Sequence, residues 1–144
     1  MILFLISVVS LGCSESNNTT YKESTDIEVS VLIHENSESF IWFRDVKIEK
    51  GINAYDLTEI VVDGDLESTY YASMFSHLVQ SIMGKANKDP NYWIIFLWDH
   101  TQRKWIPLPV GADLFSLKNG HVIGWVYTEY GKEIVGLPSP GSEY

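Results

Sequence analysis

The sequence predicts an α+β fold, a mixed β-sheet with one short α-helix. Residues 27–33 largely alternate apolar with polar side chains, which is the pattern of a half-buried strand. Residues 53–62 place apolar side chains at helical spacing instead. Residues 92–98 are apolar at every position, so both faces of this third segment need cover. The length of 144 residues suits a single domain.

The folded part is expected to begin with strands at residues 27–33 and 40–48. Asn53 can cap the helix that follows, because its side chain can accept a hydrogen bond from the first turn. Ala54 and Leu57 then lie on one apolar face of the helix. Strand, strand, helix is the opening of a β-grasp fold, so we expect a β-grasp-like sheet.

Residues 66–83 are ambiguous from the local pattern. Their apolar side chains fall close to helical spacing, and Gly84 could end such a helix. We nevertheless predict a strand at residues 77–83, because of the family resemblance described below, and keep a helix as the alternative. Residues 66–76 stay open between helix and loop.

The C-terminal elements are separated by clear turn signals. The polar residues 99–103 divide residues 91–98 from residues 104–108, which predicts a β-hairpin. Further along, we expect a brief strand at Phe115 and Leu117, a tight turn at Asn119-Gly120, a closing strand at residues 121–127 and a loose tail at residues 131–144. The folded domain would then occupy residues 27–130.

The N-terminal residues predict export and anchoring. Residues 1–11 form an apolar run that is too short to span a bilayer but suits the hydrophobic region of a signal peptide. The run ends at Gly12-Cys13, and the polar residues 14–26 follow as a tether. Residues 1–13 therefore resemble a lipoprotein signal in which Cys13 carries the lipid. We expect an extracytoplasmic, lipid-anchored protein; a plain cleaved signal and a retained hydrophobic N-terminus are the alternatives.

Composition argues against several functional classes. The formal net charge is −9 with only 10 Lys and Arg and no basic cluster, which argues against nucleic acid as a partner. Cys13 is the single cysteine, so no intrachain disulfide can form. The four histidines lack the spacing of metal ligands, and no nucleophile motif or glycine-rich phosphate loop is present. We therefore expect no metal site and no enzymatic activity.

Five short motifs occur in the order seen in the C-terminal domain of transcobalamin. They are GINAYDL at residues 51–57, LVQSIMG at 78–84, YW at 92–93, GAD at 111–113 and GHVIGW at 120–125. Residues 27–128 thus resemble a transcobalamin-like C-terminal domain, which is part of a wider group of soluble-ligand-binding β-grasp domains.

The resemblance implies a function in ligand binding. In transcobalamin, this domain closes over cobalamin that a larger helical domain holds. It therefore implies the smaller half of a binding site, with a cobalamin-like molecule as the candidate ligand and a surface or transporter protein as the candidate partner. It also places Phe75, Ser76, His77 and Leu78 at the ligand-facing edge.

The doubly apolar strand supplies three more candidate ligand-binding residues. Tyr92, Phe96 and Trp98 project from one of its faces. Rigid aromatic rings suit either a planar ligand or the anchor points of a protein interface. The alternative function is therefore a cell-surface module that docks a protein or a glycan and binds no small molecule.

The lipid anchor can be tested at Cys13. We expect Cys13→Ser to move the protein from the membrane fraction to the soluble fraction, because a serine cannot carry the thioether-linked lipid that holds a protein on a bilayer. Fractionation of host cells measures this distribution. A variant that stays with the membrane and keeps its N-terminus uncleaved would contradict the anchor.

Overall fold

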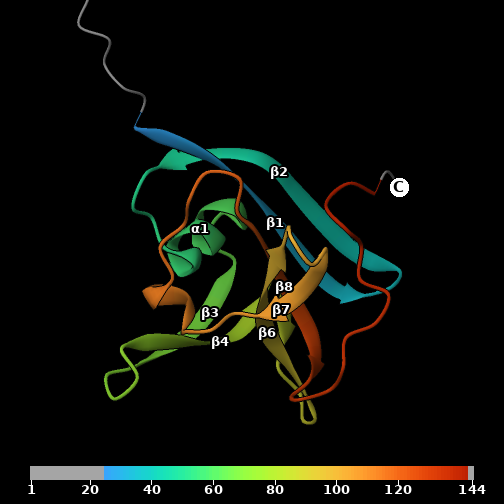
Figure 1. Ribbon diagram of the computed structural model, residues 1–144. Coiled ribbons are helices and arrows are strands. Elements are labelled where there is room, and N and C mark those ends of the chain that lie inside the picture. The colour runs from blue at the N-terminus through green and yellow to red at the C-terminus, as the bar shows by residue number, and fades with distance from the viewer. Residues whose placement is uncertain (1–24, 143–144) are drawn as a thin grey trace, which may run out of the picture.

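Two β-sheets and one helix make up the described part of the chain, residues 25–142 of a computed structural model (Figure 1). The predicted signal segment with Cys13 and residues 14–24 of the tether lie outside the described residues. No helix among the described residues is long and apolar enough to cross a membrane.

The large sheet is mixed. Its five strands lie in the order β2 (Ser39–Glu49), β1 (Asp26–Asn36), β8 (Val122–Glu129), β6 (Asn91–Asp99) and β7 (Lys104–Pro107). β1 and β8 run parallel, whereas the other neighbouring strands are antiparallel. These strands match the predicted ones closely, and the predicted α+β class with one short helix is confirmed.

Helix α1 (Ala54–Val61) begins where the sequence predicts it, because the Asn53 side chain accepts a hydrogen bond from the Asp56 amide at 2.8 Å. One side of α1 is fully buried against β8. There the Thr58 hydroxyl donates to the Ala54 carbonyl at 2.7 Å and accepts from the Trp125 indole at 2.8 Å. This buried pair of hydrogen bonds fixes the helix on the sheet.

A second, three-stranded sheet contains the segment that the sequence left ambiguous. Its strands are β3 (Leu66–Tyr71), β4 (Ser76–Ile82) and β5 (Lys85–Ala86). The predicted strand is therefore confirmed and the helical alternative is wrong; β3 is neither the helix nor the loop considered for residues 66–76. The helical spacing misleads because Tyr70, Met74 and Leu78 are exposed, so no apolar stripe is buried.

The brief strand predicted at Phe115 and Leu117 is wrong. A short 3₁₀-helix η1 (Ala112–Leu114) precedes these residues, and only an isolated bridge between Ser116 and Asn53 has strand-like pairing. The Leu117 amide donates to the Ile52 carbonyl at 3.0 Å, and the Leu117 side chain is buried. The segment therefore closes the core beside the start of α1 without joining either sheet.

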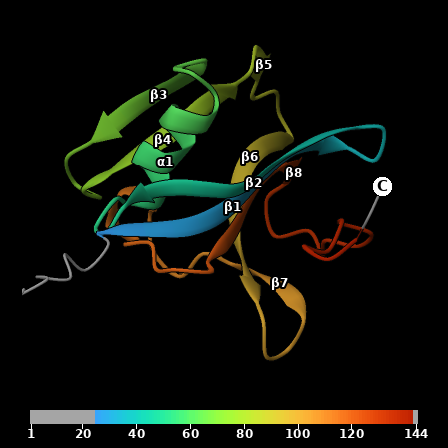
Figure 2. The same cartoon turned by 90° about the horizontal axis from the view of Figure 1, so that it is seen from above.

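One face of the large sheet packs against α1 and the small sheet, which lie on the same side of it (Figure 2). Large apolar side chains from all three units meet there, and each contributes about 1.5–3 kcal/mol when fully buried. They include Val31, Trp93, Ile123 and Trp125 from the large sheet, Leu57 from α1 and Ile82 from β4.

The opposite face of the large sheet is covered by residues 131–142. Pro138 is buried there, and its carbonyl accepts a hydrogen bond from the Trp105 indole at 3.1 Å. The Trp105 ring lies over Gly124, where a Cβ would come within 3.0 Å of the indole. Glycine at this position thus lets the ring pack flat against β8, beside the buried Phe96.

The tail that the sequence predicts to be loose, residues 131–144, is described as far as Ser142, and Arg44 of β2 contacts it. Residues 131–142 form no helix or strand, but the Arg44 guanidinium donates to the carbonyls of Pro140 and Ser142. The same guanidinium lies 4.5 Å above the Trp42 ring. The tail is held because the aromatic residues on this face need cover from water.

Candidate ligand-binding cleft

A cleft opens where β4 of the small sheet and β6 of the large sheet diverge. β6 pairs with β8 over Asn91–Leu97 but with β7 only from Phe96 onward, so its first half has a free edge. At the closed end of the cleft, the Asn87 carboxamide joins the two strands. Its Nδ2 donates to the Val79 carbonyl at 2.9 Å, and its Oδ1 accepts from the Trp93 amide at 2.9 Å.

The cleft has a volume of about 390 Å³ and mostly apolar walls. Its other end is bounded by the segment that leaves β7, where the Leu108 amide donates to the Ile95 carbonyl at 3.1 Å. No lysine or arginine lines it. The lining residues are Ser76, His77, Leu78, Val79, Asn87, Tyr92, Trp93, Ile94, Ile95, Gly111, Ala112, Trp125 and Tyr130.

The structure brings four of the seven predicted ligand-binding residues together in this cleft. Ser76, His77 and Leu78 line it from β4, and Tyr92 lines it from β6. The other three lie elsewhere. Phe75 is 68% exposed in the turn before β4, whereas Phe96 and Trp98 face the other side of the large sheet, near Trp105.

Phe75 has a strained backbone. Its φ angle is +50°, in the left-handed region that glycine or asparagine usually occupies. The hairpin turn therefore holds a large apolar side chain out in solvent at a conformational cost. The exposed ring lies at the tip of the β3–β4 hairpin, outside the cleft itself.

Asp113 of η1 fixes the first two residues of β4. One carboxylate oxygen accepts from the Ser76 hydroxyl at 2.9 Å and from the His77 amide at 2.7 Å, and the other lies 2.6 Å from His77 Nδ1. The Asp113 side chain is only 16% exposed. Because Nδ1 is engaged by the carboxylate, Nε2 is the imidazole atom left for a ligand.

The His77 ring is also held from its face. It stacks on Tyr55 of α1, with ring centroids 4.1 Å apart and an interplanar angle of 9°. The Tyr55 hydroxyl is in turn bonded to Glu59 and Ser68, and burial raises the pKa of this phenol. The imidazole is therefore held in one orientation by α1, β3 and η1 together.

Opposing effects act on the Asp113 carboxyl. Burial alone would raise its pKa, but the hydrogen bonds from the His77 amide, the His77 ring and the Ser76 hydroxyl outweigh burial and hold the pKa below its ordinary value. The carboxylate is thus stabilised in its charged form at neutral pH. The Ser76 hydroxyl is engaged by this carboxylate at 2.9 Å.

Three residues that shape the cleft are not among the site residues predicted from the sequence. Asn87 bridges the strands and Asp113 fixes His77, while Gly111 lets η1 approach β4, because a Cβ at this position would overlap the Ser76 side chain. The GAD motif at residues 111–113 was a usable signal, since it contains both Gly111 and Asp113. Nothing in the local pattern around Asn87 indicates a bridge between two sheets.

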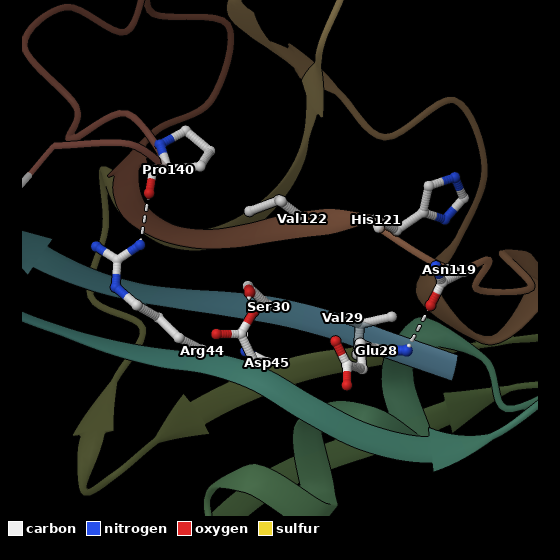
Figure 3. A pocket seen from close by; sticks show the side chains of 10 residues that line it. Glu28, Val29, Ser30, Arg44, Asp45, Asn119, His121, Val122 and Pro140 are labelled. Atoms are coloured by element: carbon white, nitrogen blue, oxygen red, sulfur yellow. Dashed lines mark hydrogen bonds between the residues drawn. The ribbon is translucent and has the colours of Figure 1, made fainter. Parts of the chain in front are cut away.

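A second cavity of similar volume, about 390 Å³, lies across β1, β2 and β8 (Figure 3). Several of its polar groups are paired within the chain. The Arg44 guanidinium donates to the Pro140 carbonyl, and the Glu28 amide donates to Asn119 at 2.8 Å. None of the predicted site residues lies there. Among the described residues, no group of three or more His, Cys, Asp or Glu could hold a metal ion.

Comparison with known proteins supports the fold. No family model and no curated protein sequence matches the chain. Haptocorrin in complex with Cbi, a transcobalamin-family protein, has a TM-score of 0.58 at 17% identity, covering 73% of this chain and 25% of the haptocorrin chain. A putative metal binding protein from Ruminococcus gnavus ATCC 29149 has a TM-score of 0.52 at 10% identity, covering 72% of this chain and 97% of that one.

These identities show likeness of fold alone. The chain spans about a quarter of the haptocorrin chain. At the level of fold, this agrees with the resemblance to the transcobalamin-like domain that the sequence motifs indicate.

The lowered pKa of Asp113 predicts a pH dependence of stability. A carboxyl whose pKa is lower in the folded state stabilises the protein fully above its unfolded value of about 4, and this contribution is lost as the pH falls through the folded value. We expect Asp113→Asn to be less stable than wild type at pH 7, with the difference shrinking below about pH 4. Urea unfolding at a series of pH values measures this.

The matched control is Asp63→Asn, in the exposed turn after α1. The difference in unfolding free energy between Asp63→Asn and wild type should not shrink below about pH 4 in the way expected for Asp113→Asn. An Asp113→Asn difference that stays constant from pH 7 to pH 3 would contradict the proposed role of the carboxylate.

Proposed function

We propose that this chain binds a soluble ligand non-catalytically in the cleft between β4 and β6, outside the cytoplasm, with a partner that completes the site. The observation that carries the proposal is the cleft itself, which collects Ser76, His77, Leu78 and Tyr92 around one volume of about 390 Å³. Small-molecule sites have this character, with apolar walls and a few fixed polar groups.

The polar groups of the cleft that Asp113 holds in place suit ligand binding rather than catalysis. The His77 imidazole is held by Asp113 and Tyr55, so it can meet a ligand with little loss of side-chain entropy. Ser76 is engaged by the same carboxylate. The charge of the walls also restricts the ligand, because a carboxylate without a neighbouring lysine or arginine disfavours an anion.

A partner is part of the proposal because the mouth of the cleft is bordered by exposed apolar side chains. Leu78 is 48% exposed, Tyr92 39% and Tyr130 85%. An exposed apolar rim of this kind is typical of a surface that another molecule covers. The proposal includes a cobalamin-like ligand, which the five sequence motifs and the fold likeness to haptocorrin support. It also includes a lipid anchor at Cys13, which the apolar run ending at Gly12-Cys13 supports.

Titration of the purified protein with corrinoids by calorimetry tests the proposal. We expect a dissociation constant of micromolar or weaker, about −8 kcal/mol at most, because an open cleft leaves much of the ligand in water. His77→Ala should weaken binding about tenfold or more, through loss of roughly 1.4 kcal/mol. The control His100→Ala, in the exposed turn between β6 and β7, should bind like wild type.

The alternative function, a protein or glycan docking module, is favoured by the β3–β4 hairpin. Tyr70, Tyr71, Met74 and Phe75 are all exposed there, outside the cleft. A complete absence of heat with every corrinoid, together with a surface protein that binds wild type but not Phe75→Ser, would favour the docking module over ligand binding.

A further inference from the structure

The free edge of β6 exposes two backbone groups in the cleft. The Trp93 amide bonds to Asn87 and the Ile95 carbonyl accepts from Leu108, so both residues direct their backbone groups away from β8. The N–H and C=O of one strand residue point the same way. The Trp93 carbonyl and the Ile95 amide therefore face the cleft, and neither has a hydrogen-bond partner among the described residues.

The Asn87 side chain already shows which chemical group fits between these strands. Its carboxamide donates to β4 through Nδ2 and accepts from β6 through Oδ1. An amide is neutral, planar and both donor and acceptor, so it can satisfy a strand edge that shows one carbonyl and one N–H. A buried strand edge left without partners is costly, which favours a ligand that supplies them.

The charges around the cleft exclude the ionised relatives of an amide. Asp113 is a carboxylate beside the cleft, and no lysine or arginine lines it. An acid in place of the amide would lack the donor for the Trp93 carbonyl and would be repelled by Asp113. An ester would keep the acceptor for Ile95 but lose the same donor.

We propose that the cleft recognises an uncharged ligand through an amide group that donates to the Trp93 carbonyl and accepts from the Ile95 N–H. This rests on the proposed ligand binding at the same cleft and names the chemistry of the ligand. A primary carboxamide can do this, because one of its N–H groups and its C=O lie on the same side; it can belong to a small aromatic molecule or to a side-chain or C-terminal carboxamide of a peptide.

The test uses matched amide and ester probes with the full chain. Naphthalene-2-carboxamide with methyl 2-naphthoate represents a small-molecule carboxamide, and indole-3-propionamide with methyl indole-3-propionate represents the carboxamide end of a peptide. We expect one or both amides to bind at least tenfold more tightly than the matching ester, and the free acid indole-3-propionate to bind least. The arm with the larger ratio identifies the source of the amide.

Amide NMR locates the contact. The Ile95 N–H should shift and exchange more slowly when the amide probe binds, whereas the Ile94 N–H, which faces β8, should change little and serves as an internal control. Ile95→Pro removes the donor on a free strand edge, where proline is tolerated. It should weaken the amide and the ester alike, because both accept from the Ile95 N–H, and leave the preference for the amide in place; if it fails to fold, the wild-type probe series alone decides.

The outcomes separate the two proposals. Esters that bind as tightly as amides, or an Ile95 N–H that stays unchanged at saturation, would overturn amide recognition while leaving ligand binding in the cleft intact. If no amide, ester or corrinoid perturbs any cleft residue at millimolar concentration, both proposals fall.

Discussion

Two neighbouring strands of the large sheet, β6 and β8, have apolar side chains on both faces, and both faces must be removed from water. On one face, α1 and the small sheet bury Trp93 and Trp125; on the other, the C-terminal segment covers Phe96 and Trp105. The layers on either side of the large sheet therefore serve to bury the apolar side chains of these two strands. The small sheet contributes Val79 and Ile82 of β4 and Leu66 of β3 to the core, and the start of β4 diverges from the large sheet and leaves a cleft.

Two hydrogen-bonded contacts set the shape of this cleft. The Asn87 carboxamide joins β4 to β6 at the closed end, and the Asp113 carboxylate joins η1 to β4 beside His77. Both groups take up backbone hydrogen-bonding positions that a further strand would otherwise occupy. The cleft thus lies between the two sheets, and free backbone groups and fixed side chains border the same apolar volume.

Local pattern predicts the elements well where a single rule decides them. The alternation of apolar and polar side chains predicts β1, and the capping side chain of Asn53 predicts the start of α1. It fails at β3, where the ladder with β4 outweighs an apparent helical stripe whose side chains are exposed. Part of the site could be predicted, since Ser76, His77, Leu78 and Tyr92 are contiguous with recognisable motifs. The contact between Asp113 and His77 depends on how η1 meets β4, so the GAD motif marks Asp113 without indicating its partner.

Native mass spectrometry of the protein isolated from its own host tests most directly whether the cleft holds a ligand. We expect a non-covalent mass increment on wild type that is absent from Leu78→Asp, which places a charge at the apolar mouth. The increment should be retained by Ile60→Asp, on the exposed side of α1. Wild type without any increment, or an increment that persists in Leu78→Asp, would contradict ligand binding in the cleft.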